Sequence, residues 1–230
     1  MKNIFKESKN YKYSIIIPCY NAAPYIAQAI RSCLNQSYGN YEIIVVNDGS
    51  TDSSKRVINC FDIRYFEKEN GGPASAMNYG IEQATGDIIC FAAADDAQSP
   101  DKLEIFNKAF QEKIDFCYSG YNHANKYAYP WEYVSPAPLT PDNIKKNICM
   151  SGGAIAAHNY VFDKIKFREL PFNEDQWWAW DIYRSKYKYA MIDLPTFNYR
   201  LISTGISYSK KKLVEENVLK CNKEIDDEQT

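Results

Sequence analysis

Two adjacent carboxylates at the end of a short apolar run have the clearest potential for chemistry in this sequence. Asp95 and Asp96 follow directly on the apolar run 88–94, and Pro100 then opens a helix-like pattern. Such a run is too short to cross a bilayer and suits a strand buried on both faces. Adjacent carboxylates repel one another, and a divalent cation with substrate phosphates commonly offsets their charge. The alternative is a solvated turn that caps the next helix.

Alternating strand and helix patterns place this pair at the edge of a sheet. Strands are expected at 13–18, 41–46, 63–66 and 88–94, with helices at 24–37, from 52 to about 59, at 74–84 and from Pro100. This βα alternation predicts a parallel sheet whose ligands bind beyond the carboxyl ends of the strands. Asn21, Asp48 and Asp95 all follow such ends, so we expect one cleft to hold them. No dinucleotide fingerprint follows the first strand, which argues against an NAD-linked enzyme.

The second half of the chain is less regular. Further elements are expected as strands at 115–119 and 189–192, a Tyr/Pro-rich loop at 122–141 that covers a pocket, a small-residue segment at 151–154, and a helix at 174–186. From Lys210 the chain is charged, with a thin apolar stripe. It is interpreted as an exposed, fraying helix, and the alternative is a helix that docks on a partner or a membrane.

Composition narrows the class of protein. The 230 residues carry a formal net charge of −2, which gives no attraction to nucleic acid. Seven single cysteines without a CxxC pair indicate reduced thiols rather than disulfides or a zinc site. The amino terminus has no apolar core of a signal peptide, and no run is long enough to span a membrane. We therefore expect a cytoplasmic protein, either free or peripheral to a membrane.

Six segments stand in an order and spacing typical of one family. They are SIIIPCYNAAPYI, EIIVVNDGSTDSS, NGGPASAMNYGIEQATGDI, FAAADD, the block from Gly152-Gly153 to Glu174-Asp175, and Tyr199-Arg200. Together they resemble the family 2 glycosyltransferases of GT-A fold, from about residue 13 to 207. The resemblance implies one α/β domain over residues 1–210, with a mostly parallel sheet and helices on both faces. Residues 13–111 would form its nucleotide-sugar-binding half and 112–210 its acceptor-side half, followed by a charged tail at 211–230.

The same resemblance implies an inverting transferase that uses a nucleotide-diphosphate sugar, with a UDP-sugar as first choice. The acceptor would be a glycan, a lipid-linked sugar or a glycoprotein. Residues that match the family's nucleotide site are Pro18, Tyr20 and Asn21 for stacking on the base, Asp48 for a hydrogen bond to it, and Asn78 and Asp95 near the nucleotide. Asp48 has the alternative of a turn residue, and Asn78 that of an ordinary polar helix residue.

The resemblance also implies a metal site and a general base. Asp95 matches the metal-binding carboxylate, Asp96 follows it, and Mn²⁺ or Mg²⁺ there would neutralise the departing diphosphate. Asp175 matches the general base that takes the acceptor's proton, and Glu174 would raise one pKa of the pair. The alternative for this pair is the capping of a helix N-terminus. Trp177 and Trp178, just downstream, are interpreted either as a flat wall for a sugar ring or as core residues.

Three positions depart from the family pattern. Ala93 stands where the acidic motif usually begins with Asp, Met77 replaces an Arg, and Ile202 replaces a His. These departures favour a rival interpretation, a catalytically degenerate GT-A protein that binds or scaffolds. The two histidines, His123 and His158, lie outside the motifs and are interpreted as surface or core residues rather than ligands.

Overall fold

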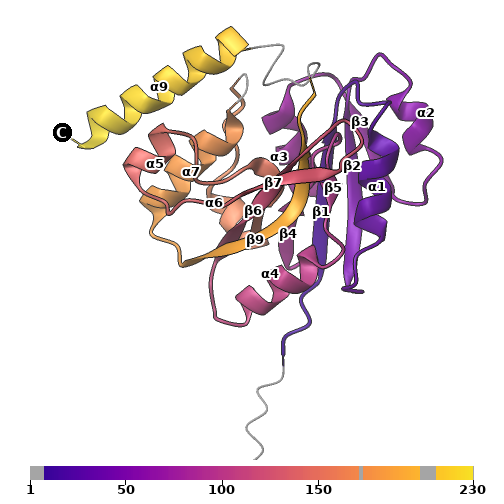
Figure 1. The fold of residues 1–230 in the computed structure, drawn as a ribbon, viewed down its shortest axis with the longest axis horizontal. Helices are drawn as coiled ribbons and strands as arrows, with labels where there is room; N and C mark the ends of the chain where they lie inside the picture. Colours follow the sequence, from indigo (N-terminus) through magenta and orange to yellow (C-terminus); the bar gives the residue numbers. More distant parts are fainter. Residues whose placement is uncertain (1–7, 171–172, 203–210, 230) are drawn as a thin grey trace, which may run out of the picture.

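A sheet of nine strands runs through the residues that the structure describes, which are 8–170, 173–202 and 211–229 of a computed structural model (Figure 1). The strands are β1 (Tyr13–Cys19), β2 (Tyr41–Asp48), β3 (Arg64–Lys68), β4 (Ile88–Phe91), β5 (Ala97–Gln98), β6 (Phe116–Ala124), β7 (Pro130–Val134), β8 (Ile155–His158) and β9 (Tyr189–Arg200). Their order is β3-β2-β1-β4-β8-β6-β9-β5, with β7 paired to β6.

Helices cover both faces of this sheet. They are α1 (Ile26–Leu34), α2 (Ser54–Ile58), α3 (Pro73–Gln83), α4 (Lys102–Phe110), α5 (Pro141–Lys145), the 3₁₀ turn η1 (Gly152–Ala154), α6 (Asn159–Lys164), α7 (Glu174–Ser185) and α9 (Lys211–Gln229). Because side chains alternate along a strand, Ile15 and Ile17 of β1 pack with α1 and α4, whereas Ile16 packs with α3. The β-branched runs thus form a strand buried on both faces, as predicted.

The expected α/β class is confirmed. Strands β1 to β4 pair in parallel, and β6 and β9 run in the same direction because β8 lies antiparallel between β4 and β6. The first four expected strands are all present, although β4 ends at Phe91 rather than at 94. The carboxyl ends of six strands therefore point to one edge of the sheet.

Two sequence-based expectations fail in the second half. The segment 122–141 is not a loop throughout, because β6 continues to Ala124 and β7 pairs with it in a hairpin. The last strand, β9, is longer than 189–192 and continues through Pro195, where its pairing with β6 shifts register. This extension brings Asn198 alongside Ala97 of the short strand β5, which follows the acidic pair.

The charged tail is wrongly interpreted as an exposed, fraying helix. Helix α9 packs on α5 and α7 (Figure 1). Its side chains Cys221 and Ile225 are completely buried. Arg168 joins the two helices, since its guanidinium donates to Asp181 of α7 and to Glu224 of α9 at 2.6–2.9 Å. Helices α5 and α7 of the same chain thus cover the buried side of α9. Among the described residues, no helix combines the length and apolar character that crossing a bilayer requires.

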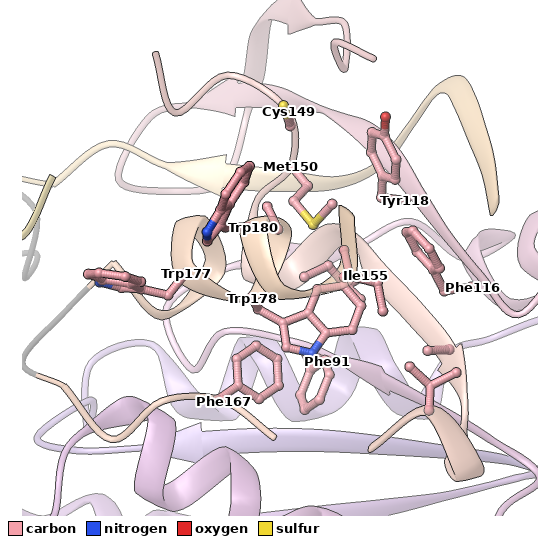
Figure 2. Packing of buried hydrophobic residues seen from close by; sticks show 14 of the residues in the cluster. Phe91, Phe116, Tyr118, Cys149, Met150, Ile155, Phe167, Trp177, Trp178 and Trp180 are labelled. Atoms are coloured by element: carbon pink, nitrogen blue, oxygen red, sulfur yellow. The ribbon is translucent and has the colours of Figure 1, made fainter. Parts of the chain in front are cut away.

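The tryptophans of α7 belong to the core rather than to a sugar-binding wall. Trp178 is fully buried and stacks on Phe162 and Phe167, with ring centroids 5.7 and 5.8 Å away. Figure 2 shows Trp178 beside Phe167. Trp177 and Trp180 are only 4% and 2% exposed. The sugar-wall interpretation is therefore wrong in this structure, and the core alternative is confirmed. These rings fix α7, and so fix the acidic pair at its start.

Trp178→Ala is expected to lower the free energy of unfolding by about 3–5 kcal/mol, because it leaves a large cavity that the packed rings can fill only in part. Chemical denaturation measures the loss. Trp131→Ala is the matched control, since Trp131 is 55% exposed on β7 and its removal should change stability by less than about 0.5 kcal/mol. Equal effects of the two variants would contradict the packing described here.

Candidate active site at the carboxyl edge of the sheet

The acidic pair lies in a tight loop between β4 and β5. The backbone N–H of Asp96 donates to the carbonyl of Ala93 at 3.3 Å. The backbone N–H of Arg200, the last residue of β9, donates to Asp96 Oδ1 at 2.8 Å. Asp96 is 2% exposed, whereas Asp95 is half-buried. The loop is therefore held against the end of β9, with Asp95 on its more open side.

The charge of this pair is only partly compensated. Burial raises the pKa of Asp96 well above its usual range, and the neighbouring charge of Asp95 adds to this rise. The backbone and guanidinium of Arg200, and the ammonium of Lys102, oppose it. Burial likewise raises the pKa of Asp95, against the charge of Arg200. A further cation beside the pair would relieve its repulsion.

These two carboxylates fit a hard divalent cation by their chemistry, because Mg²⁺ and Mn²⁺ prefer oxygen ligands. Within the described part of the chain, no group of three or more His, Cys, Asp or Glu side chains is placed to hold a metal ion. A cation at Asp95 and Asp96 would therefore need ligands from elsewhere, and phosphate oxygens commonly complete such a shell.

The second acidic pair begins helix α7. Asp175 Oδ1 accepts the backbone N–H of Gln176 at 2.8 Å, and both Glu174 and Asp175 are half-buried. Burial, with a contribution from the charge of Asp175, raises the pKa of Glu174 to about 7. Burial also raises the pKa of Asp175, although the backbone amides of Gln176 and Gly152 oppose the rise. A carboxylate that holds its proton more tightly is a stronger base near neutral pH.

The pKa of Tyr121, on β6, is affected by one carboxylate of each acidic pair. Burial raises the pKa of its phenol, and the charges of Asp175 and Asp96 raise it further. Tyr121 also lies against Phe197 and Tyr199 of β9, with centroids 5.3 and 5.5 Å away. Tyr121 thus lies on the strand next to β9, whose last residue holds Asp96, and a single pocket for the acidic residues stays a prediction.

Asp48 occupies the end of β2, two strands away from the acidic loop and therefore about 10 Å across the sheet. It is 2% exposed. Its carboxylate accepts hydrogen bonds from Lys68 Nζ, Asn70 Nδ2 and the backbone amides of Gly71 and Gly72, at 2.8–3.2 Å. Asp48 therefore fixes the turn that opens α3. Its contact with a nucleotide base stays a prediction.

The loop after β1 is tied to the loop after β2 by one side chain. Asn21 Oδ1 accepts the backbone amides of Thr51 and Asp52 at 2.8 and 3.2 Å, and its backbone adopts a left-handed conformation with φ of 49°. Tyr20 is 48% exposed, and Pro18 is half-buried at the end of β1. The ring of Tyr20 is thus accessible for the predicted stacking, while Asn21 shapes the loop that carries it.

Asn78 lies in α3 and is buried. Its Nδ2 donates to the carbonyl of Phe167 at 2.8 Å, and its Oδ1 accepts the Phe167 amide at 3.0 Å. Both ends of the amide are therefore used within the chain. This favours the alternative of a structural polar residue over the predicted place beside the nucleotide.

The two histidines lie on different strands, and the ring of His123 lies 5.7 Å from that of Tyr121. His158, at the end of β8, pairs with Ile88 at the start of β4, and its ring stacks on Tyr160 with centroids 5.2 Å apart. His123 is half-buried, and its Nδ1 lies 3.0 Å from Glu132. These positions agree with their interpretation as surface or core residues.

Two residues of the site have no role in the sequence motifs. Nothing in the sequence distinguishes Tyr121 from eighteen other tyrosines, of the 19 in the chain. Lys102 is different, since it precedes Phe106 by four residues and so occupies the apolar face of α4. A lysine on such a face is a signal that could have been found.

A comparison with protein families agrees with this geometry. Residues 14–183 match the family described as glycosyl transferase family 2. The chain belongs to this family. The match spans β1 to most of α7, and therefore includes both acidic pairs.

Two similar proteins are also named as glycosyltransferases. An uncharacterized glycosyltransferase of Rickettsia conorii is 43% identical over 145 residues, which are 60% of this chain and 24% of that protein. The chain thus spans about a quarter of that relative's length. TuaG of Bacillus subtilis, which is named for teichuronic acid biosynthesis, is 28% identical over 88% of this chain and 84% of its own length.

Solved structures show the same fold. Glucosyl-3-phosphoglycerate synthase of Mycobacterium tuberculosis, crystallised with Mn²⁺, UDP and phosphoglyceric acid, superposes with a TM-score of 0.71 at 16% identity, over 92% of this chain and 77% of its own. The predicted GT-A fold is confirmed.

Proposed function

We propose that this protein is an inverting glycosyltransferase that moves a sugar from a nucleotide-diphosphate sugar to a hydroxyl of a glycan or glycoconjugate. The observation that carries the proposal is that the end of β9 fixes Asp96 at the carboxyl edge of the sheet, where such folds bind ligands, while a second acidic pair begins α7. Family membership supports it. The UDP in the crystallised synthase makes a UDP-sugar the first donor to test, and the name of TuaG supports a polysaccharide as acceptor.

Each acidic pair has its own part in this reaction. Asp175 accepts the proton of the acceptor hydroxyl as its oxygen forms a bond to the anomeric carbon. The bond from that carbon to the diphosphate breaks, and the sugar's configuration inverts. Asp95 and Asp96 would hold Mn²⁺ or Mg²⁺, and such an ion would supply positive charge beside the departing diphosphate. Tyr20 stacks on the base of the nucleotide. Asp48 holds the turn that opens α3 in place.

The rate of transfer should rise with pH as Asp175 ionises. Asp175 acts only when ionised, and burial raises its pKa above the usual range. Glu174→Gln removes the neighbouring negative charge, so the rise should move to lower pH. A pH profile of kcat/KM for both proteins measures this change. Superimposable profiles would contradict the coupling of the two carboxyls.

A thermal-shift panel tests donor binding directly. UDP-, GDP-, CMP- and dTDP-sugars are compared with and without Mn²⁺, because a ligand that binds only the folded state raises Tm. The proposal expects the largest rise for a UDP-sugar with Mn²⁺. It fails if no donor changes Tm.

A binding or scaffolding protein that has lost turnover is the second candidate. The departures at Met77, Ala93 and Ile202 favour it, since each removes a polar group that family members carry at the nucleotide. Product analysis separates the two candidates. A donor that raises Tm while no sugar is released, either to water or to any acceptor glycan, would support the second.

A further inference from the structure

We propose that Lys102 is a positioning residue that holds the metal-binding loop and the general base in register. The proposal rests on the function proposed above, because it concerns the same two acidic pairs. Lys102 is 1% exposed and contacts neither a predicted ligand nor a reacting atom. Its ammonium group instead bonds the segments on which both pairs stand.

Three hydrogen bonds radiate from the Lys102 ammonium. Nζ donates to the carbonyl of Phe91, the last residue of β4, at 2.8 Å. It donates to Gln98 Oε1 in β5 at 2.6 Å, and to the carbonyl of Gly153 in η1 at 2.7 Å. An ammonium has three N–H donors, so all are used. The first two bonds hold the residues on either side of the loop that carries Asp95 and Asp96.

The third bond holds the turn η1. The carbonyl of Gly153 accepts from Lys102, and the backbone amide of the preceding Gly152 is among the groups that oppose the rise in the pKa of Asp175. The turn has little freedom to move, since a Cβ at Gly153 would lie only 3.3 Å from the ring of Phe197. A displacement of this turn would therefore alter the surroundings that set the pKa of Asp175.

Stability alone does not account for a lysine at this position. Burying an ammonium is costly, and an apolar side chain of similar size often serves a core equally well. Here the charge lies near the rings of Phe106 and Phe197, with Nζ 5.7 and 5.8 Å from their centroids. Burial lowers the pKa of Lys102, and the charge of Asp96 is among the groups that oppose this. In return for this cost, the ammonium of Lys102 links β4, β5 and η1.

Hydrogen exchange without substrate tests the geometric part. Lys102→Met removes the three donors but keeps the length of the side chain. We expect amides at 92–98 and 152–154 to exchange about tenfold faster than in the wild type, with the rest of the sheet unchanged. Lys108→Met is the matched control, because Lys108 lies on the exposed side of the same helix. Unchanged exchange at 152–154 in a folded Lys102→Met protein would overturn the proposal.

Kinetics test the functional part. With a donor from the thermal-shift panel, Lys102→Met should lower kcat roughly 100-fold, the usual result of a misplaced reacting group, while KM for the donor changes less than about threefold. Lys108→Met should match the wild type. A kcat equal to that of the control would overturn the proposal.

Two further outcomes distinguish a failure of the variant to fold, and a failure of the proposed function, from a failure of the Lys102 proposal. If Lys102→Met does not fold, Lys102→Arg replaces it, since a flat guanidinium keeps the charge but cannot reach three diverging acceptors. It should show the same local exchange, and normal exchange would overturn the proposal. A wild type that transfers no sugar would instead remove the proposed function, because the exchange experiment uses no substrate.

Discussion

Asp175→Asn is expected to lower the rate of sugar transfer by a factor of about 1,000, which is within the range that a positioned general base supplies. The amide cannot accept the proton, yet its oxygen can still accept the backbone N–H of Gln176, so the start of α7 should keep its shape. Affinity for UDP with Mn²⁺ should therefore stay within about twofold of the wild type. Initial rates and isothermal titration measure the two quantities.

Asp163→Asn is the matched control for this loss. Asp163 is exposed on α6, so the same chemical change there should alter neither rate nor affinity. Full transfer by Asp175→Asn would exclude Asp175 as the base. Weakened UDP binding together with lost transfer would instead indicate that the substitution disturbs the donor site.

Asp96→Asn should have opposite effects on stability and on binding. Without metal, the folded protein bears the cost of a buried, repelled charge, because burial raises the pKa of Asp96. Removing this charge should raise Tm at pH 7, and a gain of about 1 kcal/mol corresponds to about 2–4 °C for a chain of this length. With UDP and Mn²⁺, however, the rise in Tm of the wild type should be lost.

The pH dependence of this stability has a definite sign. A carboxyl whose pKa is raised on folding stabilises the folded state fully only below its ordinary pKa of about 4, and this contribution is lost as pH rises through the folded value. The Tm advantage of Asp96→Asn should therefore shrink as pH falls toward 4. An advantage that grows on acidification would contradict the burial of this charge, and Asp163→Asn again serves as the control.

The sequence was sufficient to predict the strands of the parallel half of the sheet. The β-branched runs of β1 and β2 have no competing periodicity, and each is followed by polar residues that are suited to a strand end. The short strand β5 was not predictable, because its pairing with β9 is decided by a segment about 100 residues away. The hairpin strand β7 is rich in exposed Tyr and Trp next to proline, a composition that resembles a loop.

Single residues of the site show a similar division. The acidic pairs could be assigned from their position in motifs, but the partners of Asp48 and Asn78 could not, since these depend on how neighbouring segments pack. Helix α9 was misinterpreted because its apolar stripe is thin, and because the ion pairs of Arg168 that hold it cannot be read from one helix. The motifs thus indicate candidate acidic residues, whose catalytic roles stay predictions, but not the contacts that hold these residues in place.

The bond between the Arg200 backbone and Asp96 joins residues 104 positions apart. Strand β8 likewise reaches back to β4, pairing His158 with Ile88. Contacts that close such long stretches of chain are entropically expensive and tend to form after local ones. The first half of this protein can therefore assemble its strands early, but its acidic loop acquires a final shape only when the second half arrives.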